Sequence, residues 1–171
     1  MALLQWNLNG FTHHLEELRQ LICVHPPPVL CLQETHFIAS KSYRIPSYTL
    51  YREDQIANER AAGGVAIGVL DGIHSSLIHL VTRMQAVALR VFLQRPVTIC
   101  SIYIPRSEAF TAADLVQLVT QLPAPVLLVG DLNAYHRLWG SVYTDARGRQ
   151  ITDFLNTSGL LILNDGSPTH F

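Results

Sequence analysis

A chain of 171 residues has room for one domain with a single substantial core, and 49% hydrophobic with 15% charged residues excludes a disordered segment. The 12 basic and 13 acidic residues leave a formal net charge of −1. This near balance excludes a strongly basic face overall, so that only a local surface could bind nucleic acid.

Cysteine usage and hydropathy favour an intracellular protein. Cys23, Cys31 and Cys100 match no disulfide or zinc spacing and lie in apolar stretches, so we expect all three to be reduced core residues. No apolar run approaches the roughly 20 residues that span a bilayer. The opening MALLQWNLNG does not have the pattern of a signal peptide or another targeting signal. We expect no membrane partner, and a monomer.

The first 104 residues combine one helix with a series of short strands. ALLQWN at 2–7 predicts a strand, and FTHHLEELRQLIC at 11–23 predicts a helix that ends before Pro26, because its apolar residues recur on one helical stripe. The stripe consists of Phe11, Leu15, Leu18, Leu21 and Ile22. Short apolar segments between Gly, Pro or polar turns predict further strands. These are expected at residues 29–34, 47–53, 63–70, 75–81, 86–92 and 97–104.

The remaining residues predict two helices and two strands. The first helix has Thr111 as its N-cap and Asp114 in a capping-box position, and the second ends at Gly159, a typical C′ residue. In chain order the helix, the buried strand, the second helix and the last strand span residues 111–122, 125–131, 147–159 and 160–165. Many strands with helices at intervals predict one α/β domain, a sandwich of sheets covered by helices.

Polar side chains follow apolar strands at four places in the chain. They are Asn7, Asn9, Glu34, Tyr103, Asp131 and Asn133. In layered α/β folds, loops at strand ends can bring distant side chains into one cleft. Mg²⁺ prefers oxygen ligands, often one or two carboxylates completed by waters and substrate phosphate. Glu34 and Asp131 are therefore candidate carboxylates, and the asparagines are candidates to orient them or to hold a phosphate.

Each candidate also has an ordinary structural interpretation. Acidic residues after strands often form turns or cap helices, which applies to Glu34 and to the GDLN turn. His36, two residues beyond Glu34, is a weak candidate to support the metal site. His136 is better placed, because it lies in the same loop as Asp131, but it is alternatively a surface histidine. Arg147 and Arg149 either contact phosphate or only solubilise the start of a helix.

Four motifs, LQWNLNG, LCLQET, SIYIP and LLVGDLNAYHRLWG, resemble in this order the endonuclease/exonuclease/phosphatase superfamily, which includes apurinic endonucleases and DNase I-like enzymes. The continuation GSVYTDARGRQITDFLNTSGLLILNDGSPTHF is similar to the endonuclease domain of non-LTR retrotransposons, the jockey-like group in particular. The resemblance implies a DNase I-like, two-sheet (four-layer) α/β sandwich over residues 1–171. It also implies a Mg²⁺-dependent phosphodiesterase that nicks target DNA.

The resemblance gives the first polar residues a role in metal binding. Glu34 is the principal metal carboxylate, and Asn7 orients it or the phosphate. Asn9 lies close to the metal in the same loop. Glu34, Asn7 and Asn9 are therefore the implied ligands of Mg²⁺, for which Mn²⁺ can substitute.

The remaining polar residues are implied to act on the substrate. Tyr103 contacts the scissile phosphate, and Asp131 positions or deprotonates the attacking water. Asn133 helps to stabilise the phosphorane-like transition state. Together with the metal ligands, these residues form the expected catalytic group.

Partners and location are expected from the same resemblance. DNA is the expected substrate, bound through Arg137, Arg147 and Arg149, with His136 as a possible accessory residue. A reverse transcriptase domain in a longer parent polypeptide is a possible partner. The expected location is the nucleus.

The family pattern continues beyond Phe171. It adds a strand with a further aspartate and then a Ser-Asp-His motif, for which His170 is no substitute. We therefore expect a domain that is incomplete at the C-terminus, lacks the final strands and is impaired in cleavage. The alternative is a catalytically inactive remnant that at most binds metal or nucleic acid. A weaker alternative, an RNA tail, phosphoinositide or sphingomyelin as substrate, is disfavoured by the LWGS…RGRQ…LNDGSPT run.

Overall fold

The computed structural model describes residues 2–57 and 60–167, and it divides the chain into two compact units. The sheet unit comprises Met1–Ile104 and Leu122–Asp131, and the helical unit comprises Pro105–Gln121 and Leu132–Phe171. Each unit is described by itself below. In the described part of the chain, no helix has the length and apolar character needed to cross a membrane. The predicted residue His170 lies outside the described residues.

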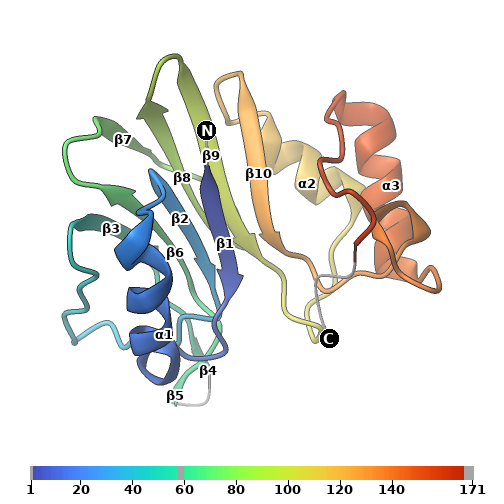
Figure 1. The fold of residues 1–171 in the computed structure, drawn as a ribbon. Helices are drawn as coiled ribbons and strands as arrows, with labels where there is room; N and C mark the ends of the chain where they lie inside the picture. The colour runs from blue at the N-terminus through green and yellow to red at the C-terminus, as the bar shows by residue number, and fades with distance from the viewer. Residues whose placement is uncertain (1, 58–59, 168–171) are drawn as a thin grey trace. The chain divides into compact units, whose positions relative to one another are not determined.

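The first sheet of the sheet unit has the strand order β1-β2-β6-β3 (Figure 1). Its strands are β1 (Leu3–Asn7), β2 (Val29–Gln33), β6 (Val65–Leu70) and β3 (Tyr48–Glu53). β1 is parallel to β2, whereas β6 is antiparallel to both β2 and β3. Every residue of β2 is buried, which explains why its sequence is a continuous apolar run rather than an alternation.

Helix α1 (Phe11–Val24) packs on the first sheet through the predicted apolar stripe. Phe11, Leu18 and Ile22 are buried, and Leu15 is partly buried against the same cluster. Leu21 was wrongly included in the stripe, because it is 54% exposed on the last turns of the helix. Cys23, predicted to lie in the core, is likewise exposed near the end of α1.

The second sheet has the order β10-β9-β8-β7. It consists of β10 (Val126–Asp131), β9 (Pro96–Tyr103), β8 (Gln85–Phe92) and β7 (Ser75–Ile78). β9 and β10 are parallel, and the other neighbours are antiparallel. β10, predicted to be buried, is half-buried along its length because it is the edge strand of this sheet. A short pairing of β4 (Ile56–Ala57) with β5 (Arg60–Ala61) was not predicted.

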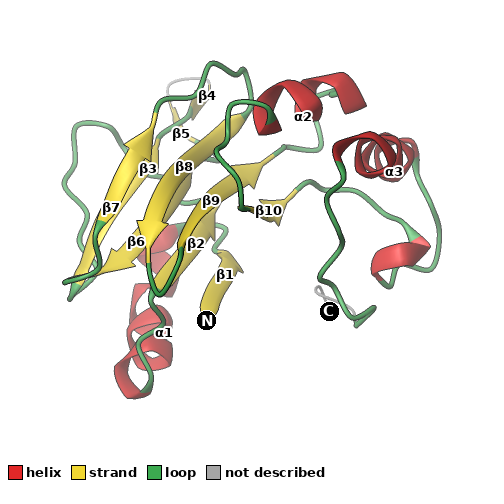
Figure 2. Cartoon of the chain, turned by 90° about the horizontal axis from the view of Figure 1, so that it is seen from above, coloured by secondary structure: helices red, strands yellow, loops and turns green. Residues whose placement is uncertain are grey.

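The core of the sheet unit lies between the two sheets. It includes Val29 and Ile67 from the first sheet and Leu89 and Ile99 from the second, all fully buried. Figure 2 shows the layers in the order α1, first sheet, second sheet. Cys31 belongs to this core and Cys100 is also buried, as predicted.

The helical unit contains α2 (Ala112–Val119), the short 3-10 helix η1 (Arg137–Trp139) and α3 (Ala146–Ser158). The Thr111–Asp114 capping box is formed, and Gly159 follows α3 with a φ of 71°, both as predicted. Within this unit the Ala112 amide donates to Gln150 Oε1 at 2.9 Å and so links the two helices.

The strand predicted at residues 160–165 is not formed, and the segment is irregular. Leu161 and Leu163 are 86% and 78% exposed. A strand needs a hydrogen-bonded neighbour, and none of the described strands pairs with this segment. High β-propensity alone therefore does not produce a strand here.

Candidate active site

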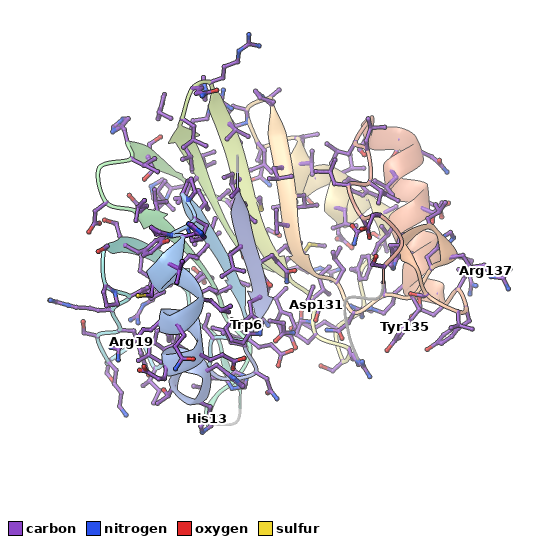
Figure 3. All side chains as sticks on the ribbon, viewed as in Figure 1. Trp6, His13, Arg19, Asp131, Tyr135 and Arg137 are labelled. Atoms are coloured by element: carbon purple, nitrogen blue, oxygen red, sulfur yellow. The ribbon has the colours of Figure 1, made fainter. Side chains whose placement is uncertain are left out.

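Three of the predicted residues meet at one edge of the sheet unit through a single amide group. Asn7 Nδ2 donates to Glu34 Oε1 at 2.7 Å and to Asp131 Oδ2 at 2.8 Å. An amide nitrogen carries two hydrogens, so each carboxylate can receive one of them. The two carboxylates therefore lie within two hydrogen-bond lengths of each other. Figure 3 shows Asp131 at the end of β10.

Parallel strand pairing within each sheet and the packing of the two sheets together explain why these residues meet. Asn7 is in register with Gln33 of β2, the residue before Glu34, and Asp131 is in register with Tyr103 of β9. Neighbouring parallel strands end at the same edge of a sheet, which places Glu34 beside Asn7 in the first sheet. Asp131 ends a strand of the second sheet, and the packing of the two sheets places it beside Asn7. The strand-end pattern in the sequence was for this reason a sound signal.

Gly130 allows β10 to approach β9 just before Asp131. A Cβ atom on Gly130 would lie 1.8 Å from the backbone oxygen of Ile102, a distance that no side chain can accept. The Ile104 amide then donates to the Asp131 backbone oxygen at 3.0 Å. The backbone of Asp131 is thus fixed on both sides of its α-carbon.

The orientation of the Asn7 amide follows from its partners. Carboxylates only accept hydrogen bonds, so the nitrogen must face Glu34 and Asp131. Asn7 Oδ1 in turn accepts from the Asn9 backbone amide at 3.2 Å. Asn9, predicted as a ligand, thereby takes part in the site through its backbone, in the left-handed region with a φ of 44°.

Glu34 is accessible and sits beside a histidine. Its side chain is 22% exposed, and its Oε2 atom lies 3.8 Å from His36 Nε2. The φ angle of Glu34 is 49°, a left-handed conformation that is uncommon for residues other than glycine. The carboxylate can therefore reach solvent while its backbone is closely constrained.

Tyr103 occupies the strand position next to Asp131. It is 8% exposed and belongs to the core between the two sheets. β8 pairs on its other side, where Gln85 is in register with Tyr103. Contact between Tyr103 and a phosphate stays a prediction.

Asn133 belongs to the helical unit, whereas Asn7, Glu34 and Asp131 belong to the sheet unit. Its Oδ1 atom accepts from Arg106 Nε at 3.0 Å, and Arg106 Nη2 donates to the Tyr135 hydroxyl at 3.1 Å. Arg106 was not singled out in the sequence. Its place directly after the SIYIP motif is the only local signal that could have indicated it.

The predicted DNA-binding arginines differ in their surroundings. The Arg147 guanidinium donates to the backbone oxygens of Glu108, at 2.6 Å, and Leu132, at 2.8 Å. It also lies over a phenylalanine ring of the same unit, 4.9 Å from the centroid. Arg147 therefore has a structural task within the helical unit, whereas Arg137 and Arg149 are exposed.

His136 is the N-cap of η1. Its Nδ1 atom accepts from the Leu138 amide at 3.1 Å, which places the ring proton of a neutral His136 on Nε2. Its ring also packs on Trp139, with centroids 5.0 Å apart. These contacts give His136 a role in local structure and do not test an accessory role in catalysis.

The edge with Asn7, Glu34 and Asp131 suits a hard cation that keeps most of its water. Two carboxylates held close together attract a cation, and oxygen is the donor that Mg²⁺ and Mn²⁺ accept. Among the described residues, no three His, Cys, Asp or Glu side chains cluster in a way that could hold a metal. An ion at Glu34 would therefore take few ligands from the described side chains.

Comparisons with known proteins identify relatives in sequence and in fold. Residues 97–171 match the family model described as endonuclease-reverse transcriptase. The chain is 28% identical to the RNA-directed DNA polymerase from the mobile element jockey of Drosophila melanogaster, over 97% of this chain and 18% of the relative. It is 25% identical to a probable RNA-directed DNA polymerase from the transposon X-element of the same species, over 100% of this chain and 19% of the relative. The chain thus spans less than a fifth of these relatives.

Solved structures show the same fold. The endonuclease domain of TRAS1, a telomere-specific non-LTR retrotransposon, matches with a TM-score of 0.77 and 23% identity, over 96% of this chain and 75% of that structure. An AP endonuclease from Leishmania major matches with a TM-score of 0.65 and 15% identity, over 90% and 65%. The predicted DNase I-like fold, two mixed sheets with helices, is confirmed.

Proposed function

Because this chain resembles the endonuclease domains of non-LTR retrotransposons in sequence and shares their fold, we propose that it is a metal-dependent nuclease domain that hydrolyses phosphodiester bonds in DNA. The observation that carries the proposal is the Asn7 amide, which joins Glu34 and Asp131. In a metal-dependent phosphodiesterase site, the carboxylate that holds the metal and the carboxylate that activates the attacking water lie close together.

Glu34 is proposed to hold Mg²⁺ or Mn²⁺, with Asn7 and Asn9 beside it. A bound ion supplies positive charge that neutralises the phosphate. The 22% exposure of the Glu34 side chain leaves room for an ion with its waters. The Asn7 amide keeps the Glu34 carboxylate in one orientation, so that little freedom is lost when an ion binds.

Asp131 is proposed to accept a hydrogen bond from the attacking water and then to take its proton. The hydrogen bond from Asn7 leaves the other lone pairs of the carboxylate in a fixed direction, which orients the water toward the phosphorus. Tyr103 is proposed to donate its hydroxyl hydrogen to a phosphate oxygen. Asn133 is proposed to donate from its amide nitrogen to the oxygens that gain charge in the transition state.

DNA is proposed as the substrate. Arg137 and Arg149 are proposed to contact the phosphates of the DNA backbone, because both side chains are exposed. Arg147 is proposed to act on DNA only indirectly, by holding its own unit together. By analogy with the relatives, which are named as RNA-directed DNA polymerases, we propose that the domain works beside a reverse transcriptase in a longer polypeptide, in the nucleus.

Residues 1–171 expressed alone are proposed to cleave slowly. The implied Ser-Asp-His histidine, which would act on the phosphate, is not among them, and loss of one member of a catalytic unit typically costs several orders of magnitude. Joining a family-like C-terminal segment should raise the nicking rate by at least about 100-fold. Equal rates with and without the segment would refute the proposed impairment.

The proposed function is tested by nicking of supercoiled plasmid in Mg²⁺ with residues 1–171 joined to the family-like C-terminal segment, together with Mn²⁺ calorimetry of the same protein. Glu34→Gln should lose Mn²⁺ affinity, and both Glu34→Gln and Asp131→Asn should lower nicking by at least about 100-fold. The matched control is Asp71→Asn, an exposed carboxylate after β6 whose Thr49 partner an amide can still satisfy. If the two site variants nick like the parent, the proposed function is wrong.

A further inference from the structure

Backbone contacts of the residues after Glu34 hold this segment in an unusual conformation. The Thr35 amide donates to Gly64 O at 3.3 Å, and the His36 amide donates to Gly63 O at 2.9 Å. Glu34 and His36 have φ angles of 49° and 51°. Such conformations of non-glycine residues are unfavourable and persist only when neighbouring structure imposes them. The segment therefore depends on the turn at Gly63 and Gly64.

Gln85 holds that turn. The Gly64 amide donates to Gln85 Oε1 at 2.7 Å in a buried hydrogen bond, and Gln85 is 5% exposed. A Cβ atom on Gly63 would lie 2.5 Å from Gln85 Oε1, and one on Gly64 would lie 2.8 Å from Thr35 Oγ1. Two glycines in succession thus allow the Gln85 amide and the Glu34 segment to approach the same turn from two sides.

Gln85 also lies in a row of residues that are in register across neighbouring strands of the second sheet, and this row ends in Asp131. It begins β8 of the second sheet, in register with Tyr103, which is in register with Asp131. The Glu34 segment, by contrast, follows β2 of the first sheet. The buried side chain of Gln85 therefore connects the strands that end near Asp131 to the segment that contains Glu34.

A buried amide is an expensive choice for a core position. An apolar side chain would avoid the desolvation of the Gln85 amide but would leave the buried Gly64 amide without an acceptor, so the choice of Gln85 is tied to the conformation of this turn. Gln33 and Ser101, both fully buried, make a second polar link between the sheets at 2.9 Å. That link joins two strands. The hydrogen bond of Gln85, by contrast, reaches the turn at Gly63 and Gly64, which accepts hydrogen bonds from the segment after Glu34.

We propose that Gln85 is a positioning residue for the metal carboxylate. Through Gly64 it fixes the segment from Glu34 to His36 against the row that ends in Asp131, and it thereby sets the spacing of the two carboxylates. This inference rests on the proposed role of Glu34 in metal binding. Nothing in the local sequence around Gln85 marks it, because its partners are remote in the chain.

The test replaces Gln85 by Met, which has a similar size but offers the Gly64 amide at most a weak sulfur acceptor in place of the amide oxygen. Hydrogen exchange of individual amides is followed by NMR, and Mn²⁺ affinity by calorimetry. The matched control is Thr98→Val, which removes a fully buried hydroxyl from the far end of the second sheet. Its hydrogen bonds join Arg90 and the Pro123 carbonyl, away from Glu34.

In Gln85→Met, the amides of Gly64, Thr35 and His36 should exchange at least about tenfold faster, and Mn²⁺ should bind at least about tenfold more weakly. Thr98→Val should change neither quantity, even where the two variants lose equal stability. Unchanged exchange at these three amides, or unchanged Mn²⁺ affinity, would overturn the inference. If the parent shows no Mn²⁺ binding that depends on Glu34, the proposed function fails, and the exchange rates alone decide whether Gln85 holds the segment.

Discussion

Asn7 and Asp131 are 124 residues apart in the chain and are joined by a hydrogen bond of 2.8 Å, from a strand of the first sheet to a strand of the second. The same amide nitrogen also holds Glu34. A neutral side chain thus keeps two carboxylates together at the edge where both sheets end.

Asn7→Ala should destabilise the protein in the absence of divalent metal. The substitution removes the donor that two part-buried carboxylates share, and hydrogen bonds to charged groups contribute about 1.5–3 kcal/mol. Urea unfolding in EDTA should show a loss of this size, and added Mg²⁺ should recover part of it. Asn164→Ala, at an exposed asparagine, is the control and should unfold like the parent. A parent-like midpoint for Asn7→Ala would show that the shared amide contributes nothing.

Gly130→Ala should destabilise the sheet unit by about 3 kcal/mol, the upper end of the usual cost of overpacking. The added methyl group would meet the Ile102 carbonyl at 1.8 Å and force β10 away from β9. Gly72→Ala is the matched control, because Gly72 also has a positive φ, of 88°, but no atom within 4 Å of an added Cβ. Thermal unfolding should separate the two variants clearly, and equal melting temperatures would contradict the close approach of the strands.

Arg147→Ala should lower the free energy of unfolding by about 2–3 kcal/mol, since it removes hydrogen bonds to two backbone carbonyls, each worth about 1 kcal/mol, and a packed guanidinium. Arg137→Ala and Arg149→Ala should each cost less than about 0.5 kcal/mol, as is usual at the surface. The two surface variants should instead each reduce the salt slope of DNA binding by about 0.9. The prediction is refuted if Arg147→Ala unfolds like the other two.

The cysteines should differ in reactivity and should make stability depend on alkaline pH. Burial raises the pKa of the Cys100 thiol from 9.0 to about 12, and burial also raises the pKa of Cys31. In the unfolded chain these thiols ionise near pH 9.0, so their contribution to stability is complete below pH 9 and declines as the pH rises toward 12. A Cys100→Ala variant should show a weaker decline than the parent in urea titrations over this range.

Iodoacetamide at pH 8 provides a second measurement of the same difference. Cys23 is exposed and should be alkylated in the native protein, whereas Cys31 and Cys100 should react only after unfolding. Mass spectrometry of peptides from the native and denatured protein distinguishes the three sites. Rapid alkylation of Cys100 in the native state would contradict its burial.

The carboxylate pair could be predicted from sequence because it depends on strand ends. An apolar run followed at once by Asn7, Glu34 or Asp131 is a local pattern. Parallel pairing of β1 with β2 brings Asn7 and Glu34 together, and the packing of the two sheets adds Asp131. Gln85 and Arg106 could not be found in this way. Their roles depend on partners that are remote in the chain, Gly64 for Gln85 and Asn133 for Arg106, and no local spacing records these contacts.

The errors in the predicted fold have a common physical cause. The strand expected at 160–165 has the right composition, but a strand exists only with a neighbour, which composition does not reveal. Leu21 was placed on the helical stripe and Cys23 was expected in the core from its apolar context, yet both are exposed while Ile22 between them is buried. The two residues therefore lie outside the face of α1 that packs on the sheet, and the limits of that face depend on its packing partner.

The shared amide of Asn7 has a consequence for the ion that is proposed to bind at Glu34. The carboxylates of Glu34 and Asp131 are already held close together before a cation binds. Binding of the cation would therefore require little rearrangement of the chain. Mg²⁺ gives up its own water slowly. We therefore expect loading to be limited by the departure of a water molecule from the ion, and Mn²⁺, which exchanges water faster, to load sooner than Mg²⁺ at equal concentration.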